Sequence, residues 1–172
     1  MSSQPHPITG TWALQTFGLY LPDTTPTPDT PALLHPLGNA PLGRITFTAD
    51  GYMSCTLTSR DAAAPIESAS WVVASDEEVV SAARAMTTYC GPFRLYKDSD
   101  NDNGQALLAT AVDIALDPNW MGKPQVRRWE LRDGEKTLVL RPVQDIVLPD
   151  GTKTTAVLVW HRLDGVKASA NL

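Results

Sequence analysis

The segment 43–60, GRITFTADGYMSCTLTSR, constrains the fold more strongly than any other part of the sequence. Two β-prone runs flank a short ADG turn signal, in which Gly51 tolerates the positive φ that a tight turn requires. In the second run Met53, Cys55 and Leu57 alternate with residues that carry hydroxyl groups. The segment is therefore predicted to form a β-hairpin whose second strand has one buried face and one face in water.

Similar short runs continue along the chain. The further strand candidates are 12–21, 93–96, 105–116, 124–131, 137–143 and 154–163. Turns rich in Gly, Asp and Pro separate the later ones, at DPNWMG, RDGEK and LPDGTK. About eight short strands with such turns indicate an all-β fold, either an antiparallel barrel or a sandwich. A barrel has the advantage that it leaves no exposed edge strand.

Two segments depart from the strand pattern. Residues 75–89 have a helical period with acidic residues near the start, and Gly91-Pro92 is expected to end this single helix. Residues 22–36 are too rich in Pro and Thr for a helix or an interior strand. We expect this long loop to lie as a lid over an opening.

The chain has 172 residues and a formal net charge of −5, which fits one globular domain and argues against a nucleic-acid or acidic-membrane partner. The first ten residues lack the features of a signal peptide, and no apolar run is long enough to span a membrane. We therefore expect a cytoplasmic protein in which Cys55 and Cys90 remain thiols. The spacing of the cysteines and the three histidines gives no support for a metal site, and no cofactor-binding motif is present.

The motifs GTW, LGRITFTADGYMS, YCGPFRLY, LDPNWMGKPQVRRWEL, TLVLRP and LVWHR occur in this order over nearly the full length. In this respect the chain resembles the small lipocalin-like domain family of fungi and bacteria, within the calycin or lipocalin superfamily. The resemblance implies an up-and-down barrel over about 9–164 in one domain of 1–172, with flexible termini. It also implies that Arg162 packs over the Trp12 ring and closes one end of the barrel, a cation–π contact.

Family members often carry Tyr at the position of Phe93 and His near the position of Thr110. If that His carries chemistry in relatives, this protein does not use the same group. The family resemblance therefore predicts the fold more specifically than an activity.

The candidate catalytic residues are Arg127, Asp113 and Tyr89. In 124–131, Arg127 shares a face with Trp129, so a buried Trp129 implies a buried guanidinium that needs a carboxylate or a ligand oxygen. Asp113 is the expected partner, and small alanines on its face would leave room for a ligand. A purely structural ion pair and an outward-facing Asp113 are the alternatives, because both faces of 105–116 are apolar.

The candidate substrate-binding residues are Tyr52, Phe47, Met53, Trp120, Trp129, Trp160 and Thr110. Tyr52 is placed either in a pocket or on the surface, Tyr89 either in the cavity or at the packed end of the helix, and Trp120 either as a turn anchor or at the barrel mouth.

Three functions are compatible with these residues. The first is a cofactor-independent cyclase or isomerase for a polyketide- or terpenoid-like intermediate, as the resemblance to auxiliary proteins of secondary metabolism implies. The second is a non-catalytic carrier or sequestering protein for a small apolar metabolite. For each of these two functions, the expected partner is a small apolar or amphipathic metabolite. The third is a filled barrel that acts through its surface. A cavity without a convergent polar pair, with Asp113 or Arg127 pointing outward, would favour the carrier.

Overall fold

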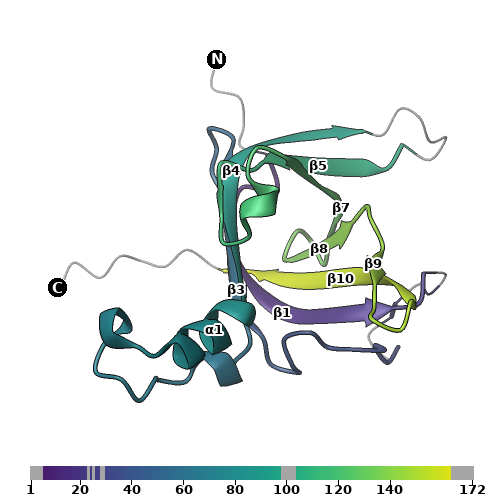
Figure 1. Cartoon of the computed structure of the whole chain (residues 1–172). Coiled ribbons are helices and arrows are strands. Elements are labelled where there is room, and N and C mark those ends of the chain that lie inside the picture. The colour runs from purple at the N-terminus through teal and green to yellow at the C-terminus, as the bar shows by residue number, and fades with distance from the viewer. Residues whose placement is uncertain (1–5, 23, 25, 28–29, 98–103, 164–172) are drawn as a thin grey trace.

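A computed structural model describes residues 6–22, 24, 26–27, 30–97 and 104–163 (Figure 1). Its elements are β1 (Gly10–Tyr20), β2 (Leu42–Phe47), β3 (Tyr52–Thr58), η1 (Asp61–Ala63), η2 (Trp71–Val73), α1 (Asp76–Arg84), β4 (Met86–Lys97), β5 (Ala106–Ala111), β6 (Ile114–Ala115), η3 (Pro118–Trp120), β7 (Pro124–Arg132), β8 (Thr137–Pro142), β9 (Ile146–Val147) and β10 (Lys153–Arg162). The flexible termini expected from the sequence fall largely at 1–5 and 164–172, outside the described residues.

The strands form a closed antiparallel barrel in which sequential strands are neighbours. The order is β1-β2-β3-β4-β5-β7-β8-β10, and β10 pairs back with β1 to close the ring. Two short strands are added, β6 on β4 and β9 on β10. The predicted all-β barrel of about eight strands is thus confirmed, and closure leaves few unpaired strand edges.

The β2–β3 hairpin forms as its sequence predicts. Ile45 pairs with Cys55 and Phe47 with Met53, and Gly51 has a φ of +92° in the turn between the strands. Buried and exposed positions alternate along β3, so that Met53, Cys55 and Leu57 face the interior. The alternation in the sequence therefore gave the correct inner face for this strand.

The helix is shorter than its sequence pattern suggests, which corrects the prediction for 75–89. It spans Asp76–Arg84, and Met86 already belongs to β4. Tyr89 therefore lies inside a strand, where it pairs with Cys55, and Gly91-Pro92 continues that strand instead of ending a helix. Backbone pairing with β3 from Met86 onward outweighs the local helical period, because it joins the segment to the barrel.

The β1 strand has two different neighbours along one edge. Its first residues pair with β2 from Gly10 to Ala13. Farther along, Leu19 donates from its amide nitrogen to Leu34 O at 2.9 Å, and Leu33 donates to Leu19 O at 2.8 Å. Part of the Pro- and Thr-rich loop therefore pairs with the half of this β1 edge that β2 does not reach.

One end of the barrel is closed by residues from both ends of the described chain. Trp12 on β1 is completely buried and pairs in register with Arg162 on β10. The indole Nε1 of Trp12 donates to Ile8 O at 2.9 Å. The indole ring, with its N–H paired, forms part of the hydrophobic core together with Phe47, Met53 and Leu138.

Candidate functional site

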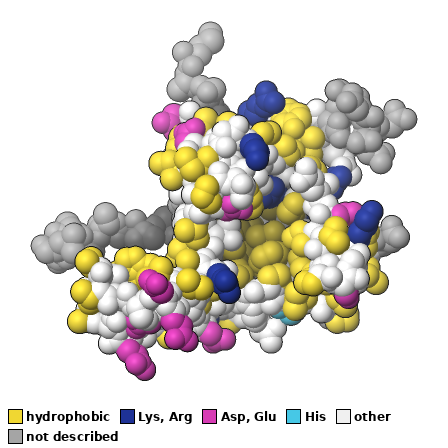
Figure 2. All heavy atoms as spheres, viewed as in Figure 1, with side chains coloured by type: hydrophobic (Ala, Val, Ile, Leu, Met, Phe, Trp, Pro, Cys, Tyr) yellow, Lys and Arg dark blue, Asp and Glu magenta, His cyan; other side chains and the backbone are white. Residues whose placement is uncertain are grey.

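A cavity of about 440 Å³ occupies the barrel interior on the side away from Trp12 and Arg162. Its apolar walls come from β1, β2, β3, β8 and β10. These wall residues are Phe17, Ile45, Leu57, Leu140, Leu158 and Trp160. Figure 2 shows an apolar hollow near the centre of the view. A volume of this size suits a small organic molecule.

Several polar side chains line the same cavity. They are Cys55, Thr87, Tyr89, Gln125, Arg127, Gln144 and Asp145. Gln144 and Asp145 lie between β8 and β9 and are exposed, whereas Tyr89 and Cys55 are buried. The cavity thus passes from an aqueous, polar mouth to a largely apolar interior.

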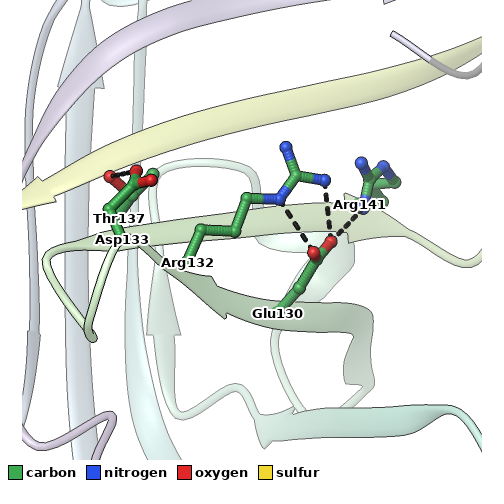
Figure 3. A network of polar contacts seen from close by, with 5 residues as sticks. All are labelled: Glu130, Arg132, Asp133, Thr137 and Arg141. Carbon is green, nitrogen blue, oxygen red and sulfur yellow. Dashed lines mark hydrogen bonds and ion pairs between the residues drawn. The ribbon is translucent and has the colours of Figure 1, made fainter. Parts of the chain in front are cut away.

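Arg127 is the cation among the described lining residues, and its guanidinium donates to neutral oxygens. Nη1 donates to Val126 O at 3.0 Å, and Nη2 donates to Gln125 Oε1 at 3.2 Å. No carboxylate of the described residues lies within ion-pair distance of it. The ion pairs of β7 form on its outer face, where Glu130 accepts from Arg132 at 2.8 Å and contacts Arg141 at 3.5 Å (Figure 3).

The expected pair of Arg127 with Asp113 does not form. Arg127 pairs in register with Leu108 of β5, and cross-strand partners share one face of a sheet. Leu108, Thr110 and Val112 are buried, whereas Asp113 is exposed. The face of 105–116 that carries Leu108, Thr110 and Val112 therefore points into the barrel, and Asp113 lies on the outer face.

Asp113 instead belongs to a small polar cluster on the outside of the barrel. Tyr52 Oη donates to Asp113 Oδ2 at 3.1 Å and lies 3.5 Å from Cys90 Sγ. The sulfur and carboxylate both raise the pKa of Tyr52, the sulfur more strongly. Tyr52 lies on the exposed face of β3 and is absent from the cavity lining. Of the two positions expected for Tyr52, in a pocket or on the surface, the structure shows the surface position.

Tyr89 contributes a buried hydroxyl group to the cavity. Its ring packs edge-on against Trp120 with 5.4 Å between ring centroids. Burial raises its pKa, the thiol of Cys55 acts in the same direction, and Arg127 opposes both. Burial likewise raises the pKa of Cys55 to about 12. Both groups are therefore protonated and uncharged at neutral pH, so they serve as donors and not as bases.

The remaining sequence candidates divide between the cavity wall and the core. Trp120 and Trp160 line the cavity, but Phe47, Met53, Thr110 and Trp129 do not. Phe47 and Met53 are packed in the core, Thr110 is fully buried, and Trp129 packs against His6 with ring centroids 5.4 Å apart. A substrate-binding role for these four residues lacks support from their positions.

The sequence interpretation missed several lining residues. Gln125 shares the face of Arg127 on β7, so the same alternation could have identified it. Gln144 and Asp145 lie in a connecting segment with no regular period, and nothing in the local sequence indicates that they reach the mouth.

The loop 22–36 does not contribute to the cavity wall through any of its described residues. His35 contacts Phe17 O through Nδ1 at 3.2 Å, which fixes part of the loop beside β1. Phe17 itself lines the cavity, so the loop reaches the wall only indirectly.

Within the described ranges, no cluster of three His, Cys, Asp or Glu side chains is arranged to hold a metal ion. In the same part of the chain, no helix is both long and apolar enough to cross a membrane.

The comparisons with known proteins identify a family over nearly the whole length. Residues 9–163 match the family model described as a lipocalin-like domain. No curated protein matches the chain significantly.

Proposed function

The chain belongs to the lipocalin-like domain family, and from this premise we propose that its barrel binds a small, mostly apolar metabolite as a carrier or sequestering protein. A lipocalin-like barrel fits a small hydrophobic ligand. The observation that carries the proposal is the cavity of about 440 Å³, which has apolar walls and a polar mouth.

The position of Asp113 favours binding over acid–base catalysis. With Asp113 on the outer surface, Arg127 forms no ion pair with any carboxylate of the residues that the structure describes. Tyr89 and Cys55 are protonated at neutral pH, and the carboxylate of Asp145 lies at the exposed mouth. The described lining therefore offers hydrogen-bond donors in the interior and places its one carboxylate at the exposed mouth, which favours binding over general base catalysis.

A binding assay with a neutral fluorescent probe tests this function. N-phenyl-1-naphthylamine is expected to gain fluorescence in the cavity, and the Leu158→Trp variant should reduce this gain by filling the space. His161→Trp is the matched control, because His161 is exposed on the outer face of the same strand. Equal binding by both variants would show that the probe does not occupy the cavity, and lack of binding to the native protein would overturn the proposal.

A cofactor-independent cyclase or isomerase is the second candidate, and the inward-facing Arg127 and Tyr89 favour it. Two donors in an apolar cavity can polarise a carbonyl group while the walls fix a reactive conformer of a polyketide- or terpenoid-like intermediate. To test it, the protein is incubated with a metabolite extract of its producer and the products are separated by mass. A compound that is replaced by an isomer of equal mass supports catalysis, provided that Leu158→Trp abolishes the conversion. Retention of an unchanged compound supports the carrier.

A further inference from the structure

We infer that the metabolite taken up by this cavity carries one carboxylate group on an apolar body, and that Arg127 binds this group. The inference rests on the proposed function, which it extends from an apolar ligand to an amphipathic anion. It combines a guanidinium that forms no ion pair with the described residues, an apolar wall beside it, and the position of both relative to the mouth.

The first observation concerns the charge of Arg127. Val126 O and Gln125 Oε1 accept two of the five N–H groups that a guanidinium offers. Both acceptors are neutral, so they satisfy hydrogen bonds without compensating the charge. A partly buried guanidinium gains most from a carboxylate, which accepts two parallel N–H bonds and neutralises the charge.

The titratable groups that line the cavity with Arg127 do not pair with its guanidinium as a carboxylate would. Tyr89 and Cys55 are uncharged at neutral pH because burial raises the pKa of each. The side chain of Asp145 also lines the cavity, but it lies beyond ion-pair distance from Arg127 and is exposed at the mouth, where water and salt screen charges. A ligand anion at Arg127 therefore meets no buried negative charge within the described lining.

The second observation is the apolar wall beside Arg127, to which the indole of Trp160 belongs. Trp160 lines the cavity and is 1% exposed, and its Nε1 has no hydrogen-bond partner among the described residues. This nitrogen is itself buried, so the indole contributes apolar surface to the wall and not a donor for the ligand.

The strand register sets the orientation of the ligand. Arg127 pairs with Pro142, next to the segment that carries Gln144 and Asp145. One inward position farther along β7, Trp129 pairs with Leu140, which in turn pairs with Leu158 in the apolar wall. The carboxylate is thus placed on the mouth side at Arg127, and the apolar body extends over Leu140 and Leu158.

Three probes of equal length test the inference: decanoate, decan-1-ol and decylamine, each titrated at neutral pH while tryptophan fluorescence is recorded. Trp120 and Trp160 lie in the cavity wall and report on binding. Decanoate is expected to bind about ten- to a hundredfold more tightly than decan-1-ol, as a hydrogen-bonded charge pair provides. In Arg127→Gln this preference should disappear, so that decanoate and decan-1-ol bind about equally well. The affinity for decan-1-ol should change little.

Arg128→Gln is the matched control. Arg128 adjoins Arg127 on the opposite face of β7, where its Nε donates to Gln105 Oε1 at 2.8 Å. This variant should retain the full preference for decanoate. Loss of the preference in both variants would indicate a general effect of surface charge and would overturn the inference.

The outcomes separate the inference from the function on which it rests. If none of the probes binds the folded native protein, the proposed function itself fails. If the acid and the alcohol bind equally, or the amine binds best, the cavity binds small molecules but the assignment of a carboxylate is wrong. Should Arg127→Gln not fold, the ratio of decanoate to decan-1-ol affinity in the native protein still decides.

Discussion

The guanidinium carbon of Arg162 lies 4.0 Å from the centroid of the Trp12 ring, over the closed end of the barrel. The same guanidinium donates to three backbone carbonyls, Thr9 O at 2.8 Å, Glu135 O at 2.9 Å and Pro7 O. One side chain near the end of β10 thus joins the segment before β1 to the β7–β8 turn. This arrangement ties together parts of the chain that are distant in sequence.

Substitution of Arg162 by Met should lower the free energy of unfolding by about 2–4 kcal/mol, through loss of the cation–π contact and of the charged hydrogen bonds. Chemical denaturation followed by circular dichroism measures the change. In a double-mutant cycle with Trp12→Leu, which removes the aromatic ring, the coupling between the two side chains should be about 0.5–2 kcal/mol. Arg128→Met, a substitution on the outer face, should change the stability by less than about 1 kcal/mol, and a coupling of zero would contradict the stacking contribution.

Replacement of Gly91 by Ala should destabilise the barrel by about 1–3 kcal/mol or more, because the added Cβ would lie 1.9 Å from Ala111 O, a backbone atom that cannot move independently. Thermal unfolding provides the measurement. Gly122→Ala is the control: Gly122 has a φ of +72° and open space around it, so it should cost only about 1–2 kcal/mol of left-handed backbone strain. Equal stability of Gly91→Ala and the native protein would show that β4 and β5 are not this close.

The two thiols should differ in reactivity toward an aromatic disulfide reagent. Burial raises the pKa of Cys55 from 9.0 to about 12, so at pH 8 its thiolate population is about a thousandth of that of an ordinary thiol. Cys90 is only partly buried and should be the site that reacts. Mass spectrometry after labelling locates the adduct, and Cys90→Ser should abolish rapid labelling. Fast labelling of Cys55 in the folded protein would contradict its buried position.

Glu78 should make the stability of the helical segment depend on acid pH. Its carboxylate accepts from Ser68 Oγ at 2.7 Å, Ser68 N at 3.0 Å and Ser75 N at 2.8 Å, and these bonds lower its pKa from 4.5 to about 2. A lowered pKa means that the contribution is complete above about pH 4.5 and is lost as the pH falls toward about 2.

The difference in melting temperature between the native protein and Glu78→Gln should therefore be largest at neutral pH and shrink between pH 4.5 and 2. Glu77→Gln is the control, since Glu77 neighbours Glu78 in the first turn but does not form the capping box with Ser75. A constant difference across this pH range would contradict the role of the Glu78 carboxylate.

The sequence alone determined most of the barrel. Alternation identified the inner residues of β3, and the turn at Gly51 indicated the β2–β3 pairing, because both signals are local properties of a strand and a tight turn. Motifs along the whole chain indicated the family that the comparison then identified. The same local reasoning placed Arg127 together with Trp129 on one face of β7.

Only the tertiary structure decided which face of 105–116 lies inside. Both faces of that segment are apolar, so alternation separates Asp113 from Thr110 without showing which of them is buried. Pairing of Leu108 with Arg127 fixes the choice and leaves Asp113 outside with Tyr52. Similarly, the pairing of Tyr89 with Cys55 places it in a strand against its local helical pattern. In both places the deciding interactions come from residues distant in the chain, and a local pattern does not contain them.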